Sequence, residues 1–376
     1  MKYDVAIVGA GIAGLSLAWT LNRQGKSVII LERSANAQGA SVRNFGMVWP
    51  VGHPLGEVRD LALRSREIWL NVAQQANIWA DPRGSLTLAY EEIEAQVLRE
   101  FMHEAGNDPA VGRLVSPAEA KQICPSIRLE GLRLALHSKT EICVDPREVV
   151  HLLAPYLTTL GIEIRFATPV ATVEEGRVIL SSGDVIEADK VVVCAGPDLR
   201  DILPGVGPAA GLIRSTLQMM RLKPKGNSFP AMGVHLCAGL TLGHYANFRN
   251  CPSLSKLKAF HSVKWPKQCE EGIHVLVSQH RDGSLTVGDS HDYGDRTLPY
   301  ISEDVNQAII NALSEFLDWS EFEVAERWLG HYNTAPGQFY SWVNPAPGVW
   351  SLNLFGTGMT LSFGVAERVA NELILA

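Results

Sequence analysis

A glycine-rich turn between two short apolar runs constrains this chain more than any other feature. Residues 3–8 form a run rich in β-branched residues, which is typical of a buried parallel strand. The run leads directly into the sequence GAGIAG at residues 9–14, and apolar residues then recur at helical spacing until Gly25. A second apolar run, residues 27–31, ends at Glu32. This order predicts a strand, a tight turn, a helix and a second strand.

Each glycine of this turn has a physical role in binding a dinucleotide. Gly9 permits the tight turn, Gly11 lets backbone N–H groups approach a pyrophosphate, and Gly14 lets the helix pack against the strand. The helix that begins near Ile12 carries partial positive charge and free N–H donors at its N-terminus, where a diphosphate binds. Glu32 lies about 20 residues further on, the usual offset for a carboxylate that accepts hydrogen bonds from a ribose. A chance glycine-rich turn is the alternative, but every part stands in its expected place, and we predict a dinucleotide site.

Length and composition bound the architecture. A chain of 376 residues with 46% hydrophobic residues suits two domains, or one large domain with an insertion. The net charge of −7 and the dispersed basic residues favour neither nucleic acid nor an anionic membrane as a partner. The six cysteines show no CxxC and no metal-ligand spacing, which favours a reducing, cytoplasmic compartment. No apolar run approaches the ~20 residues that a membrane span needs.

The predicted elements alternate between two units. Helices are expected at residues 58–78, 91–104 and 145–160, and strands at 84–90, 162–166 and 190–194. Further strands are expected at 217–222, 273–277 and 284–288, and a helix at 303–317, whereas residues 227–269 show no clear pattern. We expect a discontinuous first domain, residues 1–80, 141–211 and 326–376, and a second, smaller domain, residues 81–140 and 212–325, interleaved with it.

Two further stretches favour a long cofactor. Residues 38–50, QGASVRNFGMVWP, are too apolar for an ordinary surface loop and can wrap a diphosphate while presenting N–H groups to a ring system. Residues 349–355 predict a strand, followed by GTGMT at 356–360 and a helix to Leu375. This repeats the opening arrangement, and its helix dipole could stabilise the negative charge of a reduced flavin. An ordinary glycine turn is the alternative, but beside the first motif the second one favours FAD.

Five motifs stand in the same order as in a known superfamily: GAGIAG at 9–14, Glu32-Arg33, Pro169-Val170, CAG at 194–196 and GTGMT at 356–360. In these, the chain resembles the D-amino-acid oxidase/glycine oxidase/sarcosine oxidase superfamily over essentially its whole length. The resemblance implies a discontinuous Rossmann-like FAD-binding domain with an interleaved α+β substrate domain on a mixed sheet. It also implies oxidation of a C–N bond by hydride transfer to flavin N5, with O₂ or another electron acceptor. The residues that we expect to bind FAD are Gly9, Gly11, Ile12, Ala13, Gly14, Glu32, Arg33, Ser41, Arg43, Asn44, Gly46, Met47, Val170, Ala195, Gly196, Gly356, Gly358, Met359 and Thr360.

Within that superfamily, residues 39–50 are similar to a branch associated with phosphonate catabolism. That similarity implies oxidation of an aminophosphonate, such as N-methylated 2-aminoethylphosphonate, to phosphonoacetaldehyde. The alternatives are a glycine, sarcosine or D-amino-acid oxidase, and a non-catalytic FAD-binding subunit. A flavin monooxygenase that uses NADPH is a further alternative, but no second dinucleotide fingerprint follows an apolar strand.

The chain also departs from the superfamily pattern. Residues 328–334, WLGHYNT, lack the arginine with which glycine and D-amino-acid oxidases hold a carboxylate. They also lack the cysteine that binds flavin covalently in sarcosine oxidase, so we expect non-covalent FAD. Residues 285–288 contain no match to the lysine that helps oxygen react in sarcosine oxidases, which leaves the electron acceptor open.

Several side chains are candidates for handling the substrate. The substrate amine must be neutral to release hydride, and a nearby histidine or a desolvated pocket favours that form. His331, Tyr332 and His291 are the candidate catalytic residues, and Trp49, His53 and Arg43 the candidate substrate-binding residues. Arg43, Arg214 and Arg249 are all candidates for binding an anion. Trp49, Tyr332 and Trp342 could form aromatic walls, although core packing is the favoured interpretation for each of them. No metal-ligand constellation is evident.

Overall fold

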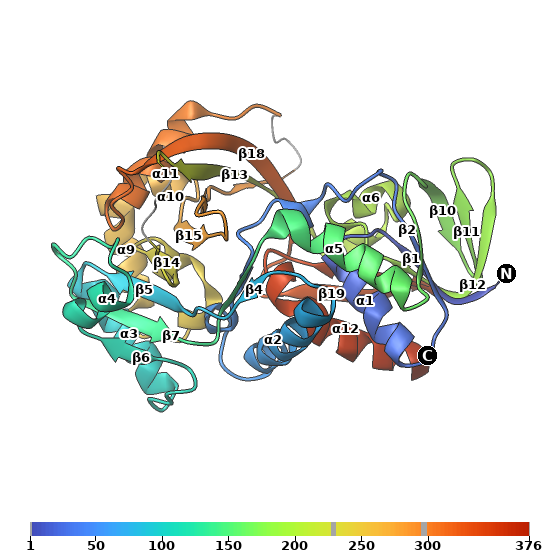
Figure 1. Ribbon diagram of the computed structural model, residues 1–376, viewed down its shortest axis with the longest axis horizontal. Helices are drawn as coiled ribbons and strands as arrows, with labels where there is room; N and C mark the ends of the chain where they lie inside the picture. Colours follow the sequence, from blue (N-terminus) through green and yellow to red (C-terminus); the bar gives the residue numbers. More distant parts are fainter. Residues whose placement is uncertain (1, 227–230, 295–298, 376) are drawn as a thin grey trace.

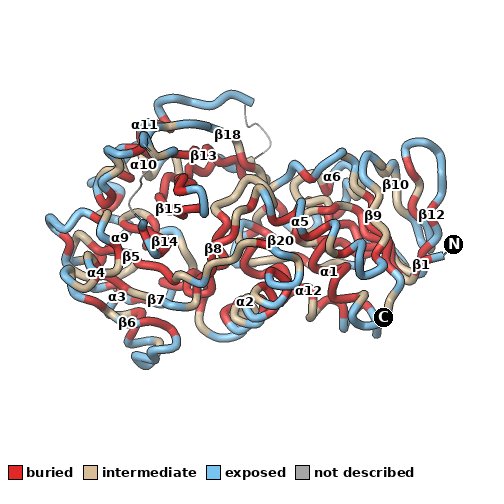
Figure 2. Tube along the Cα trace, viewed as in Figure 1, coloured by how far each residue is buried: buried red, intermediate tan, exposed pale blue. Residues whose placement is uncertain are grey.

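The computed structural model describes residues 2–226, 231–294 and 299–375, so the first part of the unassigned stretch 227–269 lies outside the described residues. Figure 1 shows two lobes side by side, with both chain termini in one of them. In each lobe the buried backbone lies at the centre and the exposed backbone at the edge (Figure 2).

The lobe with the termini is built on a mainly parallel sheet with the order β10-β11-β12-β1-β2-β9, to which β20 and β19 are added beside β12. β1 pairs in parallel with β12 and β2, and β12 pairs in parallel with β20. The bounds are β1 Tyr3–Val8, β2 Val28–Leu31, β9 Glu163–Arg165, β10 Val170–Glu174, β11 Arg177–Leu180, β12 Val185–Val193, β19 Tyr340–Ala346 and β20 Val349–Leu354.

Alternation along β1 divides the core of this lobe into two layers, because successive side chains of a strand point to opposite faces. Val5 and Ile7 pack in a cluster with residues of α1, α2, α5 and α12, whereas Ala6 and Val8 pack with β11, β12 and α6. The helices are α1 Ile12–Arg23, α2 Glu57–Gln75, α5 Pro146–Thr159, α6 Leu199–Ile202, α7 Val206–Ala209 and α12 Gly358–Leu375.

The other lobe is built on a mixed sheet with the order β17-β13-β16-β15-β14-β5-β7-β6, and β18 pairs with the far edge of β13. Helices α4 and α11 pack against one face of this sheet, and α3 and α9 pack against the other. The strands are β5 Ser85–Ala89, β6 Arg113–Val115, β7 Leu134–Ser138, β13 Ile213–Pro224, β14 His235–Ala238, β15 Val275–Gln279, β16 Leu285–Gly288, β17 Asp292–Tyr293 and β18 Phe322–Thr334. The helices are α3 Glu92–Glu104, α4 Pro117–Ile123, α8 Thr241–His244, α9 Leu254–Lys264, α10 Pro266–Glu270 and α11 Glu303–Ser314.

A third, small sheet joins residues 38–50, the expected cofactor loop, to the rest of the chain. It contains β3 Met47–Val48, β8 Ile142–Val144 and β4 Ala80–Asp81. The mixed α/β fold class is confirmed. The domain bounds remain a proposal, which the pairing of the sheets supports at most points. β18 crosses the expected boundary at 326 because it pairs with β13 from Pro224 to Ile213, so we propose that the boundary follows Thr334.

None of the helices among the described residues has the length and apolar character needed to cross a membrane. All six cysteines are free thiols, and five of them are buried. One of the buried five, Cys194, directly follows β12.

Candidate active site

A cavity of about 850 Å³ lies where the two lobes meet. Its walls in the first lobe come from the opening glycine turn, the loop after β2, residues 194–198 and the turn before α12. The second lobe contributes residues of β13 and β18, the ends of β15 and β16, and residues 244–249. Every predicted cofactor, substrate or catalytic residue lines this cavity except Gly14, Gly46 and the aromatic candidate Trp342.

The opening turn requires glycine for steric reasons. Gly9 has a φ of +110°, and a Cβ atom added to it would lie 2.6 Å from Cys194 O. A Cβ atom on Gly14 would lie 2.0 Å from Gly9 O, so Gly14 brings α1 close to the turn and does not face the cavity. Gly46 is similar, since a Cβ atom there would lie 2.0 Å from Val144 O. Both glycines therefore pack the backbone that shapes the cavity.

The residues around the N-terminus of α1 fit the diphosphate and ribose of a dinucleotide. The Oε2 and Oε1 atoms of Glu32 accept hydrogen bonds from Ala10 N–H at 2.9 Å and Ser34 N–H at 3.0 Å, which fixes the carboxylate at the cavity wall. An α-helix leaves its first N–H groups without partners inside the helix. Ser41 Oγ accepts from Ile12 N–H at 2.9 Å, and Gly11 has no side chain that could cap the others.

The loop after β2 is held in shape by its own amides and by the C-terminal turn. Asn44 Nδ2 donates to the carbonyl groups of Ala40 and Ser41 at 3.0 Å, and its Oδ1 accepts from Gly46 N–H at 2.8 Å. Trp49 N–H donates to Thr360 Oγ1 at 2.9 Å. This last bond joins the two predicted glycine-containing stretches across more than 300 residues of chain.

Tyr332 and His291 form a buried pair in the second lobe's wall. His291 Nδ1 lies 3.2 Å from Gly272 O, which can only accept, so this nitrogen carries the proton. His291 Nε2, 3.0 Å from Tyr332 Oη, is then an acceptor for the phenol. Burial lowers the pKa of His291 to about 4 and raises the pKa of Tyr332. The pair is thus neutral.

A family model described as DAO, FAD dependent oxidoreductase, matches residues 4–372. The chain belongs to this family. An opine oxidase subunit of Agrobacterium tumefaciens (strain Ach5) is 24% identical, over 99% of this chain and 93% of its own length. Glycerol 3-phosphate dehydrogenase of Caloramator mitchellensis is 24% identical over 81% of this chain, which spans only 59% of that relative. The crystal structure of glycine oxidase from Geobacillus kaustophilus superposes with a TM-score of 0.78 at 18% identity, covering 100% of this chain and 95% of that one.

This chain is therefore an FAD-dependent oxidoreductase of the DAO family, as expected. FAD, when bound, supplies the hydride acceptor. The names of these three relatives do not mention aminophosphonates, and that narrower assignment stays a proposal.

Two other predicted residues, His331 and Arg43, make contacts apart from the Tyr332–His291 pair. His331 Nδ1 lies 3.0 Å from Thr216 Oγ1, and its neighbour Tyr332 points to the opposite face of β18, so His331 is separate from the Tyr332–His291 pair. Arg43 Nη1 donates to Leu329 O at 3.0 Å, which ties the cofactor loop to β18.

The aromatic and histidine predictions also differ in outcome. Trp49 lines the cavity and packs edge-on against Tyr245 with ring centroids 4.6 Å apart. His53 is buried in the wall, where its Nδ1 lies 3.2 Å from Trp49 O, and burial lowers its pKa to about 4. Trp342 packs beside the core of the first lobe, as the favoured interpretation expects, because it stacks on Trp350 away from the cavity and forms no aromatic wall there.

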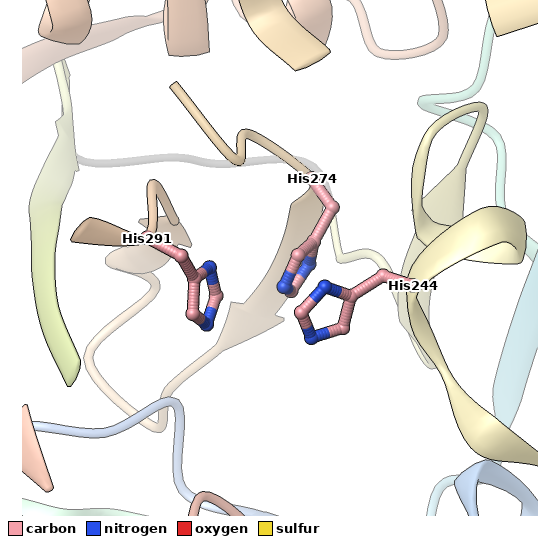
Figure 3. Close-up of side chains that lie close together, drawn as sticks. All are labelled: His244, His274 and His291. Atoms are coloured by element: carbon pink, nitrogen blue, oxygen red, sulfur yellow. The ribbon is translucent and has the colours of Figure 1, made fainter. Parts of the chain in front are cut away.

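Sequence reasoning missed His244, Tyr245, His274 and Asp289 of this flavoenzyme, all of which line the cavity. Figure 3 shows that the imidazoles of His244, His274 and His291 point toward one another. His274 and Asp289 are neighbours because their backbones exchange hydrogen bonds of 3.1 and 2.7 Å across adjacent strands. No local motif marks these residues. Strand pairing brings His274 and Asp289 together, and His244 and Tyr245 lie on the short segment that follows β14.

Proposed function

We propose that the enzyme oxidises the C–N bond of a small anionic amine. The preferred class is an (N-methylated) aminoalkylphosphonate, such as a 2-aminoethylphosphonate derivative, which gives phosphonoacetaldehyde. The reaction removes a hydride from carbon and a proton from nitrogen, and water then hydrolyses the imine to the aldehyde and an amine. The observation that carries the proposal is the Tyr332–His291 hydrogen bond in the cavity wall.

The pair supports amine oxidation because an alkylammonium ion must lose its proton before it can release hydride. A Tyr332 oxygen whose O–H donates to a neutral imidazole can accept a hydrogen bond from the N–H of a neutral amine, and the uncharged pair in a buried wall favours that form of the substrate. Tyr332 lies close to the turn before α12, since a Cβ atom added to Gly356 would lie 2.9 Å from Tyr332 Cζ. The acceptor therefore lies beside a turn that we expect to contact the cofactor.

The preference for a phosphonate has separate support. Residues 328–334 contain no arginine for a carboxylate, and residues 39–50 are similar to the phosphonate-associated branch. The alternative, oxidation of glycine, sarcosine or a D-amino acid, is favoured by the similarity in fold to glycine oxidase.

Anaerobic stopped-flow reduction of the purified holoenzyme tests both candidates. We expect 2-aminoethylphosphonate, and more so its N-methyl derivative, to bleach the oxidised flavin faster than glycine, sarcosine or D-alanine. If glycine or sarcosine reduces the flavin at least tenfold faster, the enzyme is an amino-acid oxidase. If no amine reduces it, the protein is better described as a non-catalytic FAD-binding subunit.

A further inference from the structure

One guanidinium group in the cavity wall has no polar partner among the described residues. Among the described residues, four arginines and no lysine line the cavity. Arg33 and Arg214 lie 2.6 and 3.5 Å from the carboxylate of Asp198, and Arg43 donates to a backbone carbonyl. The fourth, Arg249, is exposed, and its guanidinium forms no hydrogen bond or ion pair with any of the described residues. It is thus available to pair with an anion that enters the cavity.

Two imidazoles in the same wall also have unused hydrogen-bonding capacity. His274 is buried, and neither of its ring nitrogens forms a hydrogen bond within the described part of the chain, although Nε2 lies 3.3 Å from Asp289 Oδ1. His244 lies on the same short segment as Arg249, its ring faces the open cavity, and its centroid is 3.8 Å from that of His274 (Figure 3). A buried polar group without a partner is costly, so such a pair points to a ligand with acceptor atoms.

We propose that Arg249, His244 and His274 form the subsite for the anionic group of the substrate. This inference rests on the proposed function and names the residues that select its substrate class. A phosphonate offers three acceptor oxygens, and the planar guanidinium can grip two of them while an imidazole N–H donates to the third.

The neighbouring groups are compatible with a bound anion. Asp289 Oδ1 lies 3.3 Å from His274 Nε2, and burial raises the pKa of this carboxyl group well above its usual range. A protonated Asp289 does not repel the anion. Burial also lowers the pKa of His274, and a nearby anion would raise it again because an opposite charge favours the protonated imidazole.

The subsite lies at a suitable distance from the Tyr332–His291 pair. The ring of His291 is 4.8 Å from that of His244 and 4.9 Å from that of His274. A molecule with a short carbon chain between its amine and its anion can therefore contact Tyr332 and the anion subsite together.

The test measures anion binding without oxidation. Methylphosphonate, which has no amine, is titrated into the holoenzyme by calorimetry, with methylamine as the control ligand that lacks the anion. We expect wild-type protein to bind methylphosphonate, and Arg249→Met to weaken that binding roughly tenfold or more, because hydrogen bonds to charged groups are lost. Arg249→Lys should recover part of the affinity, and His244→Asn should also weaken binding. Arg281→Met, on an exposed turn outside the cavity, is the matched control and should bind as wild type.

Three results would overturn the subsite. The first is a wild-type protein that does not bind methylphosphonate, and the second is an Arg249→Met variant that binds it as well as wild type. The third is a co-purifying metal whose removal by a chelator abolishes binding and whose return restores it, because ligand nitrogens of His244, His274 and His291 all lie within 4.8 Å of one another. If methylphosphonate binds through Arg249 but no amine reduces the flavin, the subsite stands and the proposed oxidation fails. If amines reduce the flavin but Arg249 is irrelevant to binding, only the subsite fails.

Discussion

Replacing Tyr332 with phenylalanine should remove a hydrogen-bond acceptor for the substrate amine while leaving the cavity shape intact. The change deletes one oxygen, which lies 3.0 Å from His291 Nε2. A neutral amine that reacts beside this oxygen then loses one hydrogen bond, which is worth about 0.5–1.5 kcal/mol. At limiting amine we therefore expect flavin reduction to slow by roughly two- to twelvefold, while FAD stays bound.

The pH dependence separates a hydrogen bond to the neutral amine from proton transfer to the pair. Burial holds the pKa of His291 at about 4, so the pair stays uncharged throughout pH 6–9 and is too weak a base to take the proton of an alkylammonium ion with a pKa of about 10.4. In both wild type and Tyr332→Phe, the rate at limiting amine should therefore rise about tenfold per pH unit over this range. Anaerobic stopped-flow reduction measures both. Tyr293→Phe is the control, because Tyr293 is exposed and stacks on His291 with ring centroids 5.8 Å apart. A Tyr332→Phe variant as fast as wild type would refute the hydrogen-bonding role, and a wild-type rate independent of pH would show proton transfer to the pair instead.

Three further outcomes are expected. Glu32→Ala should weaken FAD binding about tenfold or more in a fluorescence titration, because it removes charge-assisted hydrogen bonds, and an unchanged affinity would mean that Glu32 is not the ribose ligand. Acid or heat should release all of the FAD into the supernatant after centrifugation, whereas yellow colour that stays with the denatured protein would show a covalent link. His53 has a folded-state pKa of about 4 against an ordinary value of 6.5, so the unfolded chain binds protons first, and stability falls as the pH drops through this window. Between pH 8 and pH 5 this group alone should cost about 2 kcal/mol, and urea unfolding of His53→Gln should lack that loss, while the exposed-site control His151→Gln should retain it.

Local sequence predicted which stretches of the first lobe line the cavity, because short-range sequence patterns specify the strands and glycine turns there. A run of apolar residues selects a buried strand, and the positive φ of Gly9 and the close packing of Gly14 depend on side chains that are absent. The same holds for the turn before α12. Even where the role differed, as for Gly46, the glycine was part of the loop that forms the cavity wall.

The substrate side could not be predicted to the same depth. β13 and β18 are about a hundred residues apart in sequence, and their pairing over twelve register positions determines where Tyr332 lies. The segment with His244 and Arg249 has short helices and little periodicity, so its place in the cavity wall could not be foreseen. Trp342 left two interpretations open because a tryptophan near a strand suits a pocket wall and a core, and the tertiary structure shows that it packs beside the core.

The sequence by itself therefore determined the cofactor class and the doubly layered fold of the first lobe, because a strand, a glycine turn and a helix are specified by contacts between near neighbours. Only the tertiary structure decided which histidines meet. The side chains of His274, His291 and Tyr332 converge because β15, β16, β13 and β18 pair in one register, and His244 meets them from α8, whose Thr241 Oγ1 donates to Val275 O of β15. That register is fixed by burial of apolar side chains over two whole faces of the sheet, and no short motif records it.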